Sequence, residues 1–172
     1  LEINSNLTLT DLIIEKGTGQ GLQSLVRAGY GGCIYAVDNS CIRMTRTVVR
    51  DCQAPTGGAL YMGKETKLIL EDAVFESNTA VNLGGAISMK AATMNIVVGS
   101  SATFANNMVI GVPEIPSMCN FELTCQNVYP VDIGSYAGGA LFMSQASSIK
   151  VTGAGTKLIV DSNLAGNFLG KK

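Results

Sequence analysis

The sequence has no histidine and no CxxC pair. Zinc and iron–sulfur sites are built mainly from such residues, so we expect no metal, and nothing else in the sequence indicates a cofactor. Charged residues make up 15% of the chain, against about 25% in an average domain. The twelve basic and thirteen acidic residues are scattered and give a formal net charge of −1, which argues against a nucleic-acid partner.

Long hydrophobic runs are also missing, although 47% of the residues are hydrophobic and the mean hydropathy is +0.28. Apolar stretches such as LIIE are short, whereas a transmembrane helix needs about 20 consecutive apolar residues. We therefore expect no membrane insertion by this segment. A length of 172 residues favours a single domain, residues 1–172. The first residue is leucine, which suggests a processed protein or a fragment.

The sequence contains a repeat that begins with a glycine pair. Four segments read GGCIYA, GGALYM, GGAISM and GGALFM, and they start at residues 31, 57, 84 and 138. The offsets between successive starts are 26, 27 and 54 residues. Periods of this length indicate a solenoid, in which each repeat stacks on its neighbour.

Each repeat also ends on a similar segment, represented by FESN at residues 75–78. Related segments lie at residues 13–17, 48–52, 103–107 and 159–163. Five closing segments for four glycine pairs leave both ends of the sequence in the middle of a repeat. Because a freestanding solenoid needs polar caps at its ends, we expect a piece of a longer array or a partner in an assembly.

Apolar residues alternate with polar ones within a repeat, as at Leu68 and Leu70. Such alternation, broken by Gly, Asn and Ser, predicts short β-strands. Three strands in about 26 residues predict an all-β parallel β-helix of about five coils. In this interpretation the third strand ends at Asn78, a turn runs through Asn82, and the next coil opens at Gly84. Residues 109–137 interrupt the pattern as one long inserted loop.

The combination of GGAL or GGAI with FxxN, at residues 57–60 with 75–78 and 84–87 with 104–107, resembles the repeat of the chlamydial polymorphic outer membrane proteins. Similar right-handed parallel β-helix repeats occur in secreted and surface proteins of algae and other microbes. The resemblance covers most of the chain outside residues 109–137. It departs from the motif at three positions, Cys33, Cys52 and Val160. It implies a right-handed solenoid, an extracellular or cell-surface location and a role in adhesion, and it transfers no catalytic residue.

The chain has an odd number of cysteines, at positions 33, 41, 52, 119 and 125. Disulfides are expected, since Asn6-Leu7-Thr8 is also a glycosylation sequon and both features fit an extracellular protein. Cys119 and Cys125 are close enough in sequence to close a small loop. One pair is expected among the three cysteines of one coil, with Cys33–Cys52 slightly favoured, and the partner of the fifth cysteine stays open.

Asn78, Asn107 and Asn163 share the last position of the closing segment. An inward asparagine at a turn hydrogen-bonds the backbone and its counterpart in the next coil, so we interpret this row as a structural ladder. The alternative is a row of polar ligands.

Tyr35, Tyr61 and Phe142 share another register, with Ser88 between them. An aromatic row on a sheet face either shields the sheet by stacking or binds sugar rings. Surface glycans are therefore one possible class of partner.

The carboxylates are the remaining candidates for chemistry, because polysaccharide-cleaving β-helices use carboxylate clusters. Asp72 lies in register with Arg46, and Glu76 with Arg50, one coil apart. Stacked opposite charges at this spacing predict ion pairs on a solvated face. With these carboxylates paired and no histidine, general acid–base catalysis lacks its parts, and we do not expect an enzyme.

Two segments depart from the repeat. In residues 20–30 (QGLQSLVRAGY), Leu22, Leu25 and Val26 fit one helical face, which predicts a short helix or a longer loop. Residues 109–137 hold three of the four prolines and two of the cysteines. Loops that project from a rigid scaffold often carry recognition, so we expect the interaction loop there.

The leading hypothesis is a non-enzymatic extracellular structural or adhesive module of a larger surface or filament protein. Its partners would be proteins or neighbouring coils at both ends. Two alternatives stay open: a carbohydrate-binding or polysaccharide-cleaving β-helix, which rests on fold analogy, and a structural subunit buried in a large assembly.

Overall fold

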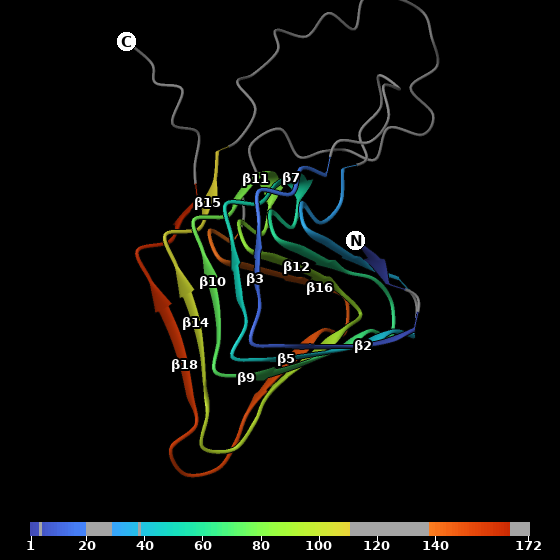
Figure 1. Cartoon of the computed structure of the whole chain (residues 1–172). Helices are drawn as coiled ribbons and strands as arrows, with labels where there is room; N and C mark the ends of the chain where they lie inside the picture. The colour runs from blue at the N-terminus through green and yellow to red at the C-terminus, as the bar shows by residue number, and fades with distance from the viewer. Residues whose placement is uncertain (4, 20–28, 38, 111–137, 166–172) are drawn as a thin grey trace, which may run out of the picture.

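The computed structural model describes residues 1–3, 5–19, 29–37, 39–110 and 138–165. Over these residues the chain forms short β-strands joined by turns, and no helix is assigned. The strands follow one another around successive coils of roughly triangular outline, and each coil stacks on the one before it (Figure 1). The predicted parallel β-helix of about five coils is confirmed.

The strands stack into four sheets, and all their pairings are parallel. Sheet A consists of β1 (Glu2–Ile3), β4 (Ile34–Ala36), β8 (Leu60–Met62), β12 (Ile87–Lys90) and β16 (Leu141–Ser144). Sheet B consists of β2 (Asn6–Thr10), β5 (Cys41–Thr45), β9 (Lys67–Glu71), β13 (Thr93–Ile96) and β17 (Ser148–Val151). Sheet C consists of β3 (Ile13–Glu15), β6 (Val48–Arg50), β10 (Ala73–Glu76), β14 (Ser101–Ala105) and β18 (Lys157–Asp161). Sheet D consists of β7 (Gln53–Thr56), β11 (Thr79–Leu83), β15 (Met108–Val109) and β19 (Leu164–Ala165).

The prediction of three strands per coil is wrong, because a complete coil has four. The extra strand is the short one of sheet D, and residues predicted to turn through Asn82 form β11. This segment lacks regular apolar alternation, so its pattern gave no strand signal. It is a strand because Thr79 and Ala80 pair with β7 on one side and β15 on the other.

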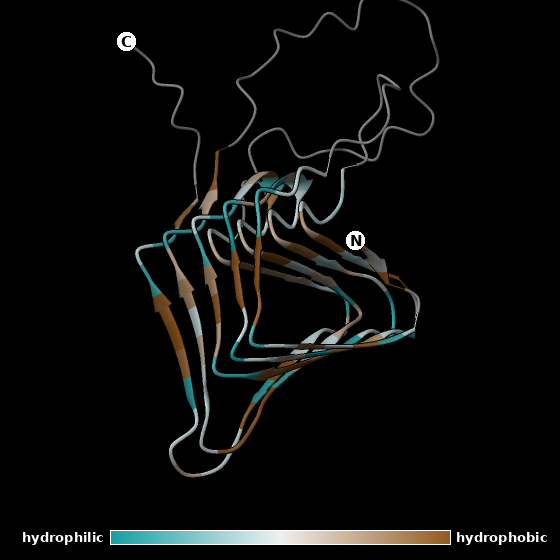
Figure 2. Ribbon diagram, viewed as in Figure 1, coloured by the Kyte–Doolittle hydropathy of each residue, from teal (hydrophilic) through white to brown (hydrophobic). Residues whose placement is uncertain are grey.

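The core consists of inward side chains that stack in rows along the axis. Leu60 lies in register with Ile34 and Ile87, and all three are fully buried. Phe75 and Phe104 stack with their ring centroids 5.0 Å apart and their planes nearly parallel. The hydropathy colouring in Figure 2 shows hydrophobic residues gathered on the strands and hydrophilic residues at many of the corners. Burial of such apolar side chains supplies most of the stabilisation of a fold of this kind.

The corner between sheets C and D has the same backbone in every coil. One residue there has a positive φ of 51–60°, and the row is Lys16, Asp51, Ser77, Asn106 and Ser162. Such a conformation is unfavourable for residues other than glycine, so the surrounding coil must hold it in place. In each coil the next residue is the one at the asparagine position.

Coil 5, formed by β16 to β19, has the last strand of all four sheets. Its apolar residues are accordingly more exposed than their counterparts. Val160 is 55% exposed, whereas Phe104, in register with it in coil 4, is fully buried. The described part of the solenoid therefore has an open apolar edge on this side.

The insertion expected at residues 109–137 begins later than the sequence suggested. Val109 belongs to β15 and lies in register with Ala80 and Ala165, and the Ile110 N–H donates to the Ala80 carbonyl oxygen at 3.0 Å. Residues 111–137, with Cys119 and Cys125, lie outside the described residues, and so do residues 20–28.

Candidate functional site

The two glycines of each pair are required for different reasons. The first has a positive φ, which is 61° at Gly31 and 62° at Gly84. The second lies against the backbone of the following coil, so that a Cβ on Gly85 would overlap the Gly139 carbonyl oxygen and lie 2.6 Å from the Met108 backbone nitrogen. Glycine therefore permits both the turn and the close stacking of coils at this corner.

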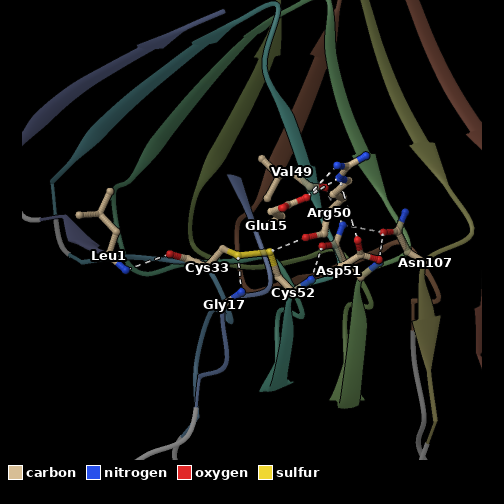
Figure 3. Close-up of a disulfide and its surroundings, with 10 residues drawn as sticks. Leu1, Glu15, Gly17, Cys33, Val49, Arg50, Asp51, Cys52 and Asn107 are labelled. Atoms are coloured by element: carbon tan, nitrogen blue, oxygen red, sulfur yellow. Dashed lines mark hydrogen bonds and ion pairs between the residues drawn. A yellow bond between two sulfur atoms is a disulfide. The ribbon is translucent and has the colours of Figure 1, made fainter. Parts of the chain in front are cut away.

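A disulfide joins Cys33 and Cys52, with their Cα atoms 5.7 Å apart. Cys33 occupies the place of Ala59 and Ala86 in the following coils, while Cys52 occupies the asparagine place. Figure 3 shows the bridge with Gly17 beside it. The Gly17 N–H lies 3.3 Å from the Cys33 sulfur, and a Cβ on Gly17 would lie 2.6 Å from that atom. The sequence favoured this pair but did not single out Gly17, whose missing side chain leaves room for the bridge. Cys41 forms no disulfide with another described cysteine.

The asparagines form a continuous hydrogen-bond ladder. The Oδ1 atom of Asn107 accepts from the backbone N–H of Asn78 at 3.1 Å and from its Nδ2 at 2.9 Å. Asn107 in turn donates through both groups to Oδ1 of Asn163, each at 2.9 Å. A second Nδ2 bond reaches the preceding coil, where Asn107 donates to the Phe75 carbonyl oxygen at 2.9 Å. Asn78 and Asn107 are fully buried, so this polar row runs inside the solenoid.

The ladder has a direction. Each backbone N–H donates to the amide oxygen of the following coil, beginning with Cys52, whose N–H donates to Oδ1 of Asn78 at 3.1 Å. Cys52 is thus both the start of the ladder and one half of the disulfide. The other end is Asn163, in coil 5.

Charged side chains pair across the outer face of sheet C. Arg50 lies between Glu15 and Glu76, with nitrogen–oxygen distances of 2.8 Å and 4.0 Å. The predicted Glu76–Arg50 pair is therefore confirmed, although Glu15 is the nearer partner. The predicted Asp72–Arg46 pair is wrong, because Arg46 forms a two-bond contact with Asp11 at 2.6 and 2.8 Å.

The Asp72 carboxylate instead accepts from the backbone N–H and the hydroxyl of Ser101, at 2.9 and 3.2 Å. Register alone could not decide the partner of Arg46, because this residue has an acidic neighbour in both adjacent coils. Two parallel hydrogen bonds to the Asp11 carboxylate stabilise the guanidinium of Arg46 more strongly than a nearby charge without such bonds would.

The Arg46 hydrogen bonds lower the pKa of Asp11 below its usual value, and those of Arg50 do the same for the pKa of Glu15. A carboxyl whose pKa falls on folding stabilises the protein above its unfolded pKa of about 4. This contribution is lost as the pH falls through the folded pKa.

We therefore expect Asp11→Asn to lower the free energy of unfolding at pH 7 and to have a shrinking effect as the pH drops through the acid range. Urea unfolding of both proteins across that range measures the difference. In an Arg46→Gln background the same substitution should have little effect at any pH. A loss that is independent of pH in both backgrounds would contradict the ion-pair assignment.

The predicted aromatic row lies on the outer face of sheet A. Tyr35 and Tyr61 are in register, with ring centroids 5.5 Å apart. Tyr30, which the alignment of repeats did not include, lies against Tyr61 at 4.4 Å. Ser88 and Phe142 continue the row in coils 4 and 5. The repeat pattern could not reveal Tyr30, because this residue precedes the glycine pair and lies in register with Thr56, which is not aromatic.

The remaining candidates are the glycosylation sequon and the side chains that could bind a metal ion. Asn6 and Thr8 of the sequon are exposed on β2, which leaves glycosylation a prediction. Among the described residues no three His, Cys, Asp or Glu side chains are grouped as a metal site would require. No helix in this part of the chain is long and apolar enough to cross a membrane.

The fold and its internal ladder define a parallel β-helix repeat protein. Residues 72–90 match the model of the Chlamydia polymorphic membrane protein repeat. The matched segment contains β10, β11 and β12, and with them Phe75, Asn78 and the Gly84-Gly85 pair. The resemblance noted in the sequence is thereby confirmed for one repeat unit. No curated protein and no solved structure matches the chain. The match indicates a repeat module of a surface or outer membrane protein.

Proposed function

We propose that the chain is a non-enzymatic structural module of a larger surface protein, in which stacked coils support an adhesive segment at a fixed position. The match of residues 72–90 to a membrane-protein repeat supports the surface location. The observation that carries the structural role is the open edge of coil 5, which has the features of a surface that receives another coil.

The hydrogen bonds of Asn163 differ from those of the other asparagines in the ladder. Its Nδ2 group donates to the Phe104 and Asp161 carbonyl oxygens, both at 2.8 Å. Its backbone N–H has no acceptor among the described residues, whereas the equivalent N–H of Asn107 donates to an asparagine oxygen in the next coil. A further coil with asparagine in the same register would supply that acceptor and cover Val160.

The first coil of a second copy would not fit this edge as well. Its residue at the asparagine position is Gly17, which has no amide oxygen to offer. The edge of coil 5 is therefore better matched to another FxxN repeat than to head-to-tail stacking of identical chains.

We assign the adhesive contact to residues 111–137, which lie outside the described residues. Their sequence contains Pro113, Pro116, Pro130, Cys119 and Cys125 and leaves the repeat pattern. The flanking β15 and Gly138 both belong to the solenoid, so the segment is anchored in it at each end.

An extended chain tests the structural role. In this variant a copy of residues 79–107, which is one complete coil, follows Asn163 directly. We expect hydrogen exchange at the Asn163 amide to slow by about tenfold or more, because the amide gains an acceptor in a buried row. We also expect the thermal midpoint to rise, because the new coil buries the apolar edge.

The matched control is the same extension with the final asparagine of the copy changed to alanine. It should cover the edge but protect the Asn163 amide much less. Unchanged exchange at Asn163 in the first variant would contradict the proposal that the edge receives a repeat. Failure of antibodies against the coils to label intact producing cells would contradict the surface location.

A further inference from the structure

A groove of about 360 Å³ lies beside the tyrosines on the outer face of sheet A. Its lining consists of Tyr35, Val37, Tyr61, Gly63, Lys64, Lys90 and Gln145. This volume is at the lower end of the range of about 300–1,000 Å³ for small-ligand sites. Aromatic rings and two ammonium groups thus share one shallow depression, and none of the described residues in its lining carries a carboxylate.

One residue in the lining of the groove, Gly63, has no side chain. Gly63 follows β8 and is in register with Lys90 of coil 4, as its neighbour Met62 is with Met89. Val37 occupies the same place in coil 2. Gly63 is not among the glycines with positive φ, so the backbone does not require glycine there. Gly63 contributes no side chain to this row, and it lines the groove together with Val37 and Lys90.

The two lysines give the groove its charge preference. Lys64 is exposed and forms an ion pair with Glu65 at 3.2 Å. Lys90 is exposed at the end of β12 and forms no ion pair with any described residue. An acidic group of a ligand would therefore meet Lys90 directly and would compete with Glu65 for Lys64.

We propose that this groove binds an acidic glycan, with a sugar ring against the tyrosine rings and its carboxylate or sulfate group at Lys90 and Lys64. Tyrosine rings offer flat apolar surface with a polar tip, which suits the mixed faces of a sugar. The inference rests on the proposed surface location, where glycans are the abundant acidic ligands.

An acidic peptide fits the groove less well. Peptides that dock on β-sheets commonly add a strand to a free edge. Here β4, β8 and β12 are each paired on both sides, so their backbone groups are already used. The groove offers ring faces and ammonium groups, and no row of backbone donors and acceptors.

Titration calorimetry with four probes tests the proposal on the full chain. The probes are a sulfated hexasaccharide from heparin, a hexamer of galacturonate, neutral maltohexaose and poly-glutamate. We expect saturable binding of at least one of the two acidic sugars, weakened by salt. Neutral maltohexaose and poly-glutamate should bind at least about tenfold more weakly. The heparin fragment carries sulfate as well as carboxylate groups, so tighter binding of it than of the galacturonate hexamer would indicate a preference for sulfate.

Three variants locate the site. Lys90→Ala removes the unpaired ammonium group, and Gly63→Val fills the groove with the side chain that Val37 already has in the same row. Each should weaken binding by about tenfold, while Lys67→Ala, on sheet B, should not. Circular dichroism and the Cys33–Cys52 bridge report whether each variant keeps the fold.

The proposal is overturned if no acidic sugar binds, or if maltohexaose or poly-glutamate binds as tightly. It is also overturned if Lys67→Ala weakens binding as much as Lys90→Ala, since that would indicate non-specific attraction. These outcomes leave the extended-coil experiment untouched, because that experiment reads the Asn163 edge and not sheet A. Failure of the glycan site and failure of the structural role are thus separable.

Discussion

Asn107→Ala should lower the free energy of unfolding by roughly 3–5 kcal/mol, since each buried polar group left without a partner costs about 1–3 kcal/mol. The substitution removes the oxygen that accepts hydrogen bonds from the backbone N–H and the Nδ2 group of Asn78. It also removes the Nδ2 group that donates to the Phe75 carbonyl oxygen. All of these groups lie in the buried row, where water cannot replace the lost partners. Equilibrium urea unfolding measures the loss.

Asn95→Ala is the matched control, because it makes the same chemical change one strand earlier. The Oδ1 atom of Asn95 is buried and has no hydrogen-bond partner among the described residues. Its removal should therefore cost less than about 1 kcal/mol. Equal losses for the two substitutions would show that the ladder contributes nothing special to stability.

Gly85→Ala should destabilise the protein by about 3 kcal/mol or more, at the upper end of the usual cost of overpacking. The added methyl group would overlap the Gly139 carbonyl oxygen and press on the Met108 backbone. Gly139 belongs to coil 5 and Met108 to the last strand of coil 4, so the clash is relieved only if these backbone segments move apart. A shift of this size lowers the thermal midpoint by roughly 6–12 °C in a chain of this length.

Gly99→Ala provides the comparison. Gly99 has a φ of 79°, but a Cβ there would meet nothing within 4 Å. Its substitution measures backbone strain without a clash, which should cost about 1–2 kcal/mol. If Gly85→Ala costs no more than Gly99→Ala, close stacking at the glycine pair does not determine the spacing of the coils.

The sequence predicted the parts of the fold that recur. The glycine pairs, the FxxN segments and the apolar alternation each reappear once per coil, and stacking converts that periodicity directly into register. The row of Asn78, Asn107 and Asn163 could be found in this way, because its members share one position in the repeat.

Features without a repeating sequence signal were harder to predict. Sheet D was missed because β11 and its counterparts are strands through pairing with neighbouring coils and carry no alternating pattern. The Asp11–Arg46 pair depends on which of two adjacent coils the guanidinium turns towards. The groove is lined by Gly63, which has no side chain where Val37 has one in the preceding coil. An alignment of repeats identifies side chains that recur and therefore gave no signal at this position.

The disulfide makes one coil of the solenoid mechanically unlike the others. Cys33 and Cys52 both belong to coil 2, so their bridge closes that coil on itself and links it to no neighbour. Under tension, coils joined only by hydrogen bonds and packing can separate from one another in turn. The segment of coil 2 between Cys33 and Cys52 stays covalently closed throughout, so this coil cannot be pulled out to its full length.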